Sequence, residues 1–370
     1  MDLAPFLQQM AATDASDLFI TVGFPVSAKV NGQMTPMTQQ NLSAEQAQAL
    51  CDSAMSEKQQ QEFADSKECN FAIAREGIGR FRVSAFWQRD LPGMVIRRIV
   101  TQIPQADALG LPPILKDIIM AKRGLVLFVG ATGTGKSTSL AALIGHRNQN
   151  SRGHILTIED PIEFVHEHAN CVVTQREVGI DTHSFDDALK SSLRQAPDVI
   201  LIGEIRSMET MEYAMSFADT GHLCVATLHA NNANQAIERI MHLAPPEQHS
   251  KLRFDLSLNM RAIIAQQLVP TVDGKGRVAA IEVLLNSPFV RDLIQRNEIG
   301  AIKEAMQKGK EQGMQTFDMA LYDLYKQGRV KLDDAIHHAD SPNDLRLMIK
   351  LDTEEGSGLG SLSGVSIDMD

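Results

Sequence analysis

The sequence of 370 residues contains few cysteines and no close pair of them. Cys51, Cys69, Cys171 and Cys224 are scattered, and none belongs to a C-x-x-C motif. A disulfide framework and a structural zinc site both depend on regularly spaced cysteines, so this pattern argues against both. A reducing cytoplasm is the simplest setting to expect.

The sequence also lacks a long apolar run and an excess of positive charge. No stretch approaches the roughly 20 apolar residues that a membrane-spanning helix needs, and the acidic N-terminal segment does not resemble a secretory signal. We therefore expect at most a peripheral association with a membrane. The formal net charge is -11 and no basic stripe is present, which disfavours nucleic acid as a partner and a DNA translocase as the function.

The order of expected strands and helices divides the chain into five parts. Residues 1–100 combine an amphipathic helix, a hairpin at Asn31–Gly32, further strands and another helix, which predicts an α+β domain. The proline-containing residues 101–113 predict a linker. Strands alternate with helices over 114–286, which predicts a parallel sheet covered by helices. Short helices are expected at 287–350, and a disordered acidic Gly/Ser tail at 351–370.

The segment GATGTGKS, residues 130–137, matches the phosphate-binding motif GxxxxGK[ST] between an apolar strand and a helix. Glycines let backbone N–H groups wrap phosphate oxygens, and the helix N-terminus adds its positive dipole end. Lys136 is expected to reach the β- and γ-phosphates of ATP, and the Ser137 hydroxyl to bind Mg²⁺. The predicted nucleotide-binding residues are Gly130, Thr132, Gly133, Thr134, Gly135, Lys136, Ser137 and Thr138.

Carboxylates follow two of the expected strands downstream of this loop, and a P-loop enzyme needs such groups near the metal and the attacking water. Glu204 ends the stretch DVILIGE, and Gly203 occupies the usual position of the metal-side aspartate. Glu204 is therefore expected to act on Mg²⁺ through water. The stretch TIEDPIEF carries Glu159, Asp160 and Glu163, which either polarise the attacking water or form only a solvated loop.

Histidines and arginines supply further candidates. His222 and His229 bracket an apolar stretch, and their separation of seven residues places them on opposite faces of a regular strand, which argues against joint metal ligation. Each is either structural or a donor to the γ-phosphate. Arginines in one expected strand pair either form a solvated face or neutralise transition-state charge on a phosphate held by another domain or subunit. These arginines are Arg80, Arg82, Arg89, Arg97 and Arg98.

Four segments of the chain closely resemble, in order and spacing, the Walker A, Asp, Walker B and His boxes of the secretion and pilus motor ATPases. The segments are GATGTGKST, ILTIEDPIEF, DVILIGEIR and GHLCVATLHA. Within that superfamily the chain resembles the type IV pilus retraction ATPases, PilT and PilU, because it is short and lacks zinc-binding cysteine pairs. The stretch FVRDLIQRNE at 289–298, Ser207 and the Gly/Ser-rich acidic extension fit the PilU branch.

The resemblance implies a PAS-like α+β N-terminal domain joined to a RecA-like P-loop ATPase domain of the α/β class, with a parallel sheet and C-terminal helices. It implies a homohexamer in which Glu163 is the general base and Glu204 supports the Mg²⁺ that Ser137 binds. The other catalytic residues that it implies are His222, His229, Arg89 and Arg97.

The implied activity is ATP hydrolysis that drives or assists pilus retraction and twitching motility. The implied location is the cytoplasm, peripheral to the inner membrane at the pilus base, with a PilT-type retraction ATPase and an inner-membrane platform protein as partners. Two functions stay open. The complete set Lys136, Glu163 and Glu204 favours a motor, whereas the 289–298 motif, Ser207 and the tail favour an ATP-binding adaptor ring on a second motor.

Overall fold

The computed structural model describes residues 1–30, 32–99 and 102–358, and only the backbone of 353–358. The chain forms two compact units. The first, unit 1, comprises Met1–Ile103 together with Glu159–Glu167 and Gln175–Ala188, and unit 2 comprises Pro104–Ile158, His168–Thr174 and the chain from Leu189 onward. The first boundary falls inside the predicted 101–113 linker. The two later segments of unit 1 were not predicted, because long-range contacts decide where they belong.

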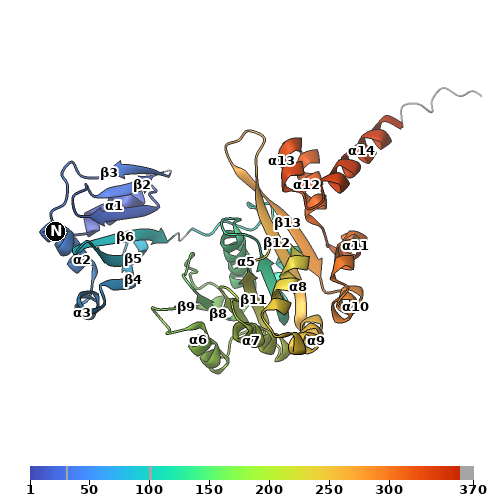
Figure 1. The fold of residues 1–370 in the computed structure, drawn as a ribbon, viewed down its shortest axis with the longest axis horizontal. Coiled ribbons are helices and arrows are strands. Elements are labelled where there is room, and N and C mark those ends of the chain that lie inside the picture. Colours follow the sequence, from blue (N-terminus) through green and yellow to red (C-terminus); the bar gives the residue numbers. More distant parts are fainter. Residues whose placement is uncertain (31, 100–101, 359–370) are drawn as a thin grey trace, which may run out of the picture. The chain divides into compact units, whose positions relative to one another are not determined.

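Unit 1 is an α+β fold with a six-stranded antiparallel sheet of order β3-β2-β1-β6-β5-β4 (Figure 1). Leu7 and Met10 of the first helix and Leu18 and Ile20 of β1 belong to one buried core, as their spacing predicts. The strands are β1 (Asp17–Thr21), β2 (Ser27–Val30), β3 (Gln33–Pro36), β4 (Glu68–Arg75), β5 (Gly79–Gln88) and β6 (Leu91–Ile99). The helices are α1 (Ala4–Ala12), α2 (Ala44–Ala54) and α3 (Glu57–Ser66).

The expected hairpin joins β2 to β3, where Val30 is paired with Gln33, although Asn31 lies outside the described residues. Capping boxes fix the starts of the next two helices. Ser43 and Ser56 each accept a backbone N–H three residues on, which begins α2 and α3 at defined positions.

A seven-stranded sheet carries the phosphate-binding loop, in the order β13-β12-β7-β11-β10-β8-β9. The strands are β7 (Gly124–Val129), β8 (Gly153–Glu159), β9 (Cys171–Glu177), β10 (Val199–Ile202), β11 (Leu223–Leu228), β12 (Met260–Pro270) and β13 (Arg277–Leu285). The pairs from β12 through β7, β11 and β10 to β8 are parallel, as expected, but β13 is antiparallel to β12. Strands β12 and β13 were not predicted, because periodicity cannot distinguish a buried apolar strand from a buried helix.

Helices connect these strands and follow them. They are α4 (Ile114–Ile119), α5 (Lys136–Asn150), α6 (Phe185–Ser192), α7 (Met208–Asp219), α8 (Ala233–His242) and α9 (His249–Asn259). The C-terminal helices are α10 (Pro288–Arg296), α11 (Ile302–Lys308), α12 (Phe317–Lys326), α13 (Leu332–His338) and α14 (Pro342–Gly358). The predicted caps are present: Ser287 and Thr316 accept the N–H groups of Val290 and Met319 at 3.3 Å. Helix α14 extends to Gly358, so the first part of the predicted 351–370 tail is helical and not a tail; the rest lies outside the described residues.

The sequence led us to expect neither disulfides nor a membrane-spanning helix, and the structure bears on both for the residues that it describes. All four cysteines are buried free thiols. Within the described ranges, every helix is too short or too polar to cross a membrane.

Candidate nucleotide-binding site

The phosphate-binding loop joins β7 to α5, so the predicted strand–loop–helix arrangement is confirmed. Five consecutive side chains of β7, from Leu125 to Val129, are buried and hold the strand in the sheet centre. The loop then turns at Gly130, Gly133 and Gly135, all with positive φ, and Gly135 is the N-cap of α5. The N-terminus of this helix therefore starts at the loop, where its dipole favours a phosphate.

Two of the glycines are required by close contacts with β12. A Cβ on Gly130 would lie 2.5 Å from the backbone oxygen of Gln266, and a Cβ on Gly135 would lie 2.9 Å from the Gln266 amide nitrogen. Around Gly133 the space is open. The loop is thus packed against the neighbouring strand on one side and accessible on the other, as a loop that binds phosphate must be.

Gln266 is a functional candidate that the sequence reading missed. Its side chain is 2% exposed, and its Nε2 donates to the carbonyl oxygen of Thr134 at 2.8 Å. Its Oε1 is buried and accepts no hydrogen bond from the described residues. Gln266 lies 132 residues from Thr134, so only the pairing of β12 with β7 brings the two together.

Lys136 folds back over the loop. Its Nζ donates to the carbonyl oxygens of Gly130 at 2.6 Å and Ala131 at 2.8 Å. The Thr134 hydroxyl donates to the same Ala131 oxygen at 2.8 Å. These bonds keep the ammonium group inside the curve of the loop, where phosphate oxygens bind in this motif.

Glu204 lies after β10 and His229 after β11, at the same edge of the sheet as the loop, because parallel strands end together. The Glu204 Oε1 is 3.0 Å from His229 Nε2, and its Oε2 accepts from Arg206 Nε at 2.7 Å. The carboxylate is 17% exposed. The Thr227 hydroxyl donates to the Gly203 carbonyl, which ties the Glu204 segment to β11. The structure thus brings together two predicted residues from separate boxes.

A cavity of about 640 Å³ opens beside this group. It is lined by Ala131 and Thr132 from the loop, His229 and residues of α8. Its volume lies within the range of small-molecule sites.

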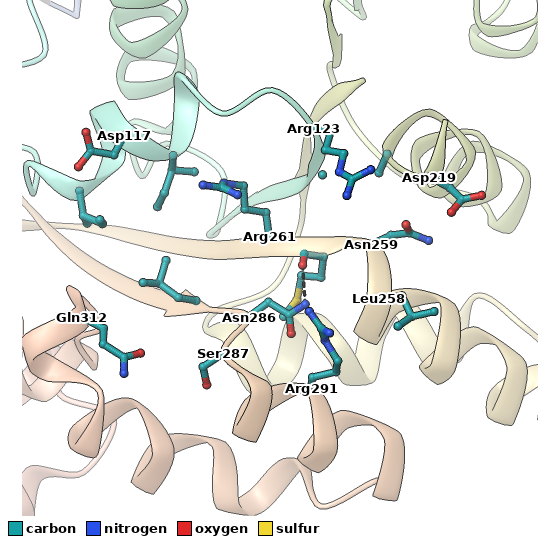
Figure 2. A pocket seen from close by; sticks show the side chains of 16 residues that line it. Asp117, Arg123, Asp219, Leu258, Asn259, Arg261, Asn286, Ser287, Arg291 and Gln312 are labelled. Atoms are coloured by element: carbon teal, nitrogen blue, oxygen red, sulfur yellow. Dashed lines mark hydrogen bonds between the residues drawn. The ribbon is translucent and has the colours of Figure 1, made fainter. Parts of the chain in front are cut away.

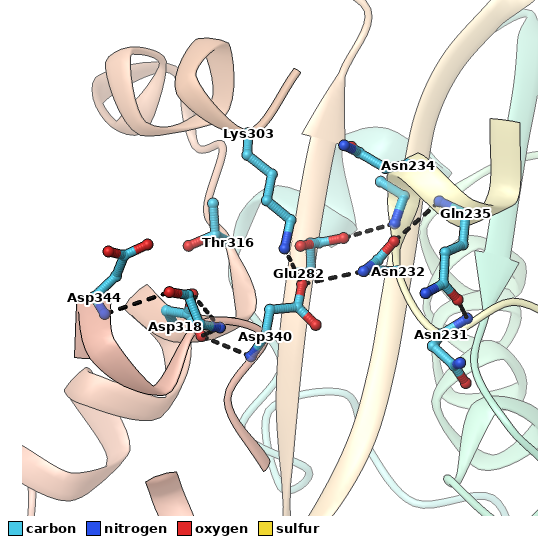
Figure 3. Close-up of polar contacts among 12 residues, drawn as sticks. Asn231, Asn232, Asn234, Gln235, Glu282, Lys303, Thr316, Asp318, Asp340 and Asp344 are labelled. Carbon is cyan, nitrogen blue, oxygen red and sulfur yellow. Dashed lines mark hydrogen bonds and ion pairs between the residues drawn. The ribbon is translucent and has the colours of Figure 1, made fainter. Parts of the chain in front are cut away.

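The residues after β11 are anchored to β13 and to the segment between α13 and α14. Asn232 caps α8 by accepting the Gln235 N–H at 3.0 Å and donates to Asp340 Oδ2 at 3.2 Å. The buried Glu282 of β13 accepts the Ala233 N–H at 2.7 Å, and Figure 3 shows Glu282 beside Asn232. The segment that carries His229 is therefore fixed at its far end by residues that lie up to 108 positions away.

Glu163 lies in the 159–167 segment, which belongs to unit 1, and its side chain is exposed. Both neighbours of Glu163 are held by β9. The Ile162 N–H donates to the buried Glu177 at 3.2 Å, and the Gln175 amide donates to the Phe164 carbonyl at 2.9 Å. Sequence reasoning missed both β9 residues, and the role of Glu163 as a base stays a prediction.

The remaining predicted residues lie elsewhere. His222 precedes β11, at the opposite end of that strand from His229, and its Nδ1 is 3.2 Å from the Phe217 carbonyl oxygen. Arg89 lies in the two-residue turn between β5 and β6, with φ of 48°. Arg97 on β6 donates to Asp17 at 2.8 Å. Their catalytic roles stay predictions.

ATP and Mg²⁺ fit this site. The loop offers backbone N–H groups, Lys136 and the Ser137 hydroxyl, and the adjacent strands supply Glu204. Among the described residues no cluster of three or more His, Cys, Asp or Glu could hold a metal alone. A Mg²⁺ ion here would need phosphate oxygens and water as further ligands, which is how nucleotide-bound Mg²⁺ is usually held. The fold and site define a P-loop ATPase.

Comparison with known proteins identifies the family. The model of the Type II/IV secretion system protein family matches residues 2–337. The type IV pilus ATPase PilU of Pseudomonas aeruginosa is 60% identical over 100% of this chain and 97% of its own length. The retraction ATPase PilT of the same organism is 40% identical over 93% of this chain and all of its own length. A crystal structure of the pilus retraction motor PilT with bound ADP has a TM-score of 0.87 at 39% identity and covers 94% of this chain and 99% of its own.

The chain therefore belongs to the Type II/IV secretion system protein family and, within it, to the PilT/PilU retraction ATPases. It is an ATPase of a pilus motor. The predicted PAS-like and RecA-like architecture agrees with the likeness to PilT.

Proposed function

We propose that the chain hydrolyses ATP as a homohexamer and that hydrolysis drives or assists type IV pilus retraction. The observation that carries this proposal is the Glu204–His229 contact at the sheet edge where the phosphate-binding loop ends. In this proposal Glu204 would hold water on Mg²⁺, and His229 would transmit a change at Glu204 to α8 and the C-terminal region. The full-length similarity to PilU and PilT supports the pilus assignment.

In this mechanism Lys136 and the loop N–H groups bind the phosphates, and Ser137 binds Mg²⁺. Glu163 takes a proton from the attacking water, which a general base must do for in-line attack. Arg89 and Arg97 neutralise charge on the phosphate in a neighbouring subunit. The working place is the cytoplasmic face of the inner membrane, with a platform protein and a PilT-type ATPase as partners.

Steady-state ATP hydrolysis by the purified full-length chain, with and without Mg²⁺, tests this proposal. Glu163→Gln should lower kcat by about 100-fold or more while ATP binding persists, because the amide keeps the shape but cannot accept the proton. Glu167→Gln, an exposed carboxylate in the same segment, is the matched control and should retain turnover.

Two outcomes would redirect the assignment. ATP binding with negligible turnover in the unsubstituted chain would favour the adaptor ring, for which a PilT-type motor supplies the hydrolysis. A monomer by light scattering in the presence of ATP and Mg²⁺ would contradict the hexamer.

A further inference from the structure

A second cavity in unit 2, of about 570 Å³, lies at the end of β7 opposite the phosphate-binding loop. Arg123 and Gly124 line it where β7 begins, whereas the loop follows Val129 at the other end. At about 3.3 Å per residue, the six-residue strand separates the two places by roughly 20 Å. The cavity is therefore not part of the ATP site.

Three arginines from three different elements line this cavity (Figure 2). Arg123 immediately precedes β7, Arg261 belongs to β12, and Arg291 belongs to α10. All three side chains are exposed, and none forms an ion pair with a carboxylate of the described residues. The cavity also has two carboxylates in its lining, Asp117 and Asp219, which lie at its two sides in the view of Figure 2 with Arg261 and Arg123 between them.

The backbone is shaped to present Arg261. Strand β12 has an irregularity between Met260 and Ala262 where it pairs with β7, so Arg261 is the extra residue of a bulge. Such bulges redirect a side chain and recur beside binding sites. The Asn286 amide fixes this bulge by donating to the carbonyl oxygens of Ser257 at 2.8 Å and Met260 at 2.6 Å.

Close packing then carries the Arg261 stem toward Arg123. A Cβ on Gly124 would lie 3.1 Å from the Arg261 Cβ and 3.7 Å from its Cδ, so the stem crosses the backbone next to Arg123. Asn286, whose backbone N–H donates to the Arg261 carbonyl oxygen at 3.0 Å, also lines the cavity, and its Oδ1 is buried and accepts no hydrogen bond from the described residues. The site thus combines several cationic donors with a polar wall.

We propose that this cavity, which we call the arginine pocket (Arg123, Arg261, Arg291 and Asn286), binds a phosphate-bearing ligand. Guanidinium groups bind phosphate in a bidentate manner, and the three arginines outnumber the two carboxylates in the lining and form no ion pair with a carboxylate of the described residues. The volume suits a nucleotide-sized molecule or a lipid headgroup. This binding does not depend on ATP hydrolysis, so it can hold or fail independently of the proposed function.

Calorimetric titration of the full-length chain with pyrophosphate tests whether the phosphate-bearing ligand is a soluble molecule. Saturating ADP without Mg²⁺ first occupies the phosphate-binding loop. One further binding event is expected, and Arg261→Gln and Arg123→Gln should each weaken it about tenfold, the effect of losing one charged hydrogen-bonding partner. Arg296→Gln is the matched control, because it removes the same charge from α10 outside the pocket and should change nothing.

Cosedimentation with phosphatidylcholine vesicles, which either contain or lack phosphatidylglycerol, tests whether the ligand is a lipid headgroup. Sedimentation that needs phosphatidylglycerol and is lost in Arg261→Gln and Arg123→Gln would support a headgroup as the ligand. The proposal is overturned if neither probe binds, or if binding is the same in these variants and in Arg296→Gln. ADP affinity and the circular dichroism spectrum should be unchanged in all three variants, which shows that the fold is intact.

Discussion

At the scale of single residues, the phosphate-binding loop depends on a glutamine that its own motif does not contain. Gln266 donates to the Thr134 carbonyl from a position 2% exposed to solvent, and the backbone of Gln266 fills the space that a side chain at Gly130 would need. Gln266 is therefore a positioning residue. It fixes the direction of a loop carbonyl and, through it, the N–H groups that meet phosphate.

We expect Gln266→Leu to raise the KM for ATP about tenfold and to lower kcat less. The reason is that the Thr134 carbonyl oxygen loses the only hydrogen bond that it accepts from a side chain of the described residues. The loop then no longer holds its binding conformation. Steady-state kinetics measure both constants. Gln267→Leu is the control, because that neighbour donates to the His338 carbonyl and not to the loop. Equal kinetics for the two variants would show that Gln266 has no special role.

At the scale of elements, the start of α8 and the C-terminal helices meet at a buried carboxylate. Glu282 of β13 is 1% exposed, and burial raises the pKa of its carboxyl to about 7, although the Ala233 N–H opposes this shift. Asp340 raises the pKa further and Lys303 lowers it, and these two form the ion pair seen in Figure 3. A carboxyl whose protonated form is favoured by burial thus helps to join α8 to the C-terminal region.

The raised pKa predicts a pH dependence of stability. Between about pH 4.5 and 7 the folded chain binds more protons at Glu282 than the unfolded chain, so this group's contribution falls as pH rises and is lost above about 7. Glu282→Gln imitates the protonated form at every pH. The free energy of unfolding of this variant, minus that of the unsubstituted chain, should therefore be about 1 to 3 kcal/mol larger at pH 8 than at pH 5. Urea unfolding at both values measures this difference.

A difference between the two chains that does not change with pH would mean that Glu282 is ionised in the folded chain. Asp318→Asn is a useful comparison. Burial also raises the pKa of Asp318, which accepts the Asp340 and Ser341 N–H groups. The two variants together separate the contribution of β13 from that of α12.

At the scale of the whole molecule, nucleotide binding should stabilise the folded chain. ATP with Mg²⁺ at about 100 times its Kd adds about 2.7 kcal/mol, which raises Tm by several degrees. Lys136→Ala should unfold as cooperatively as the unsubstituted chain but show little of this rise, because the loop lysine binds phosphate and is not part of the core. Differential scanning fluorimetry with and without ATP measures both effects.

Loss of cooperative unfolding in Lys136→Ala without nucleotide would show that the lysine supports the fold through its bonds to Gly130 and Ala131. A full ATP-dependent rise in that variant would place the nucleotide elsewhere. Lys122→Ala, an exposed lysine before β7, is the control for the loss of a charge.

The local parts of this protein could be predicted from residues that are close together in the chain. A glycine-rich loop with Lys136 between a strand and a helix, the Ser287 and Thr316 caps, and the order of the four boxes all depend on residues close in the chain, where steric and hydrogen-bonding rules act directly. Ser207, which entered the sequence analysis only through the family resemblance, is the N-cap of α7 in the structure. The family resemblance rested on these same local segments.

Contacts between residues that are distant in the chain could not be predicted and became visible in the folded molecule. Strands β12 and β13 are apolar runs without a distinguishing period, so Gln266 and Glu282 could not be connected with the loop and α8 in advance. The bulge that presents Arg261 is a property of strand pairing, and the β9 anchors beside Glu163 are separated from it in the chain. Packing brought these groups together because buried backbone and side-chain polar groups need hydrogen-bonding partners, and those partners can be far away in the sequence.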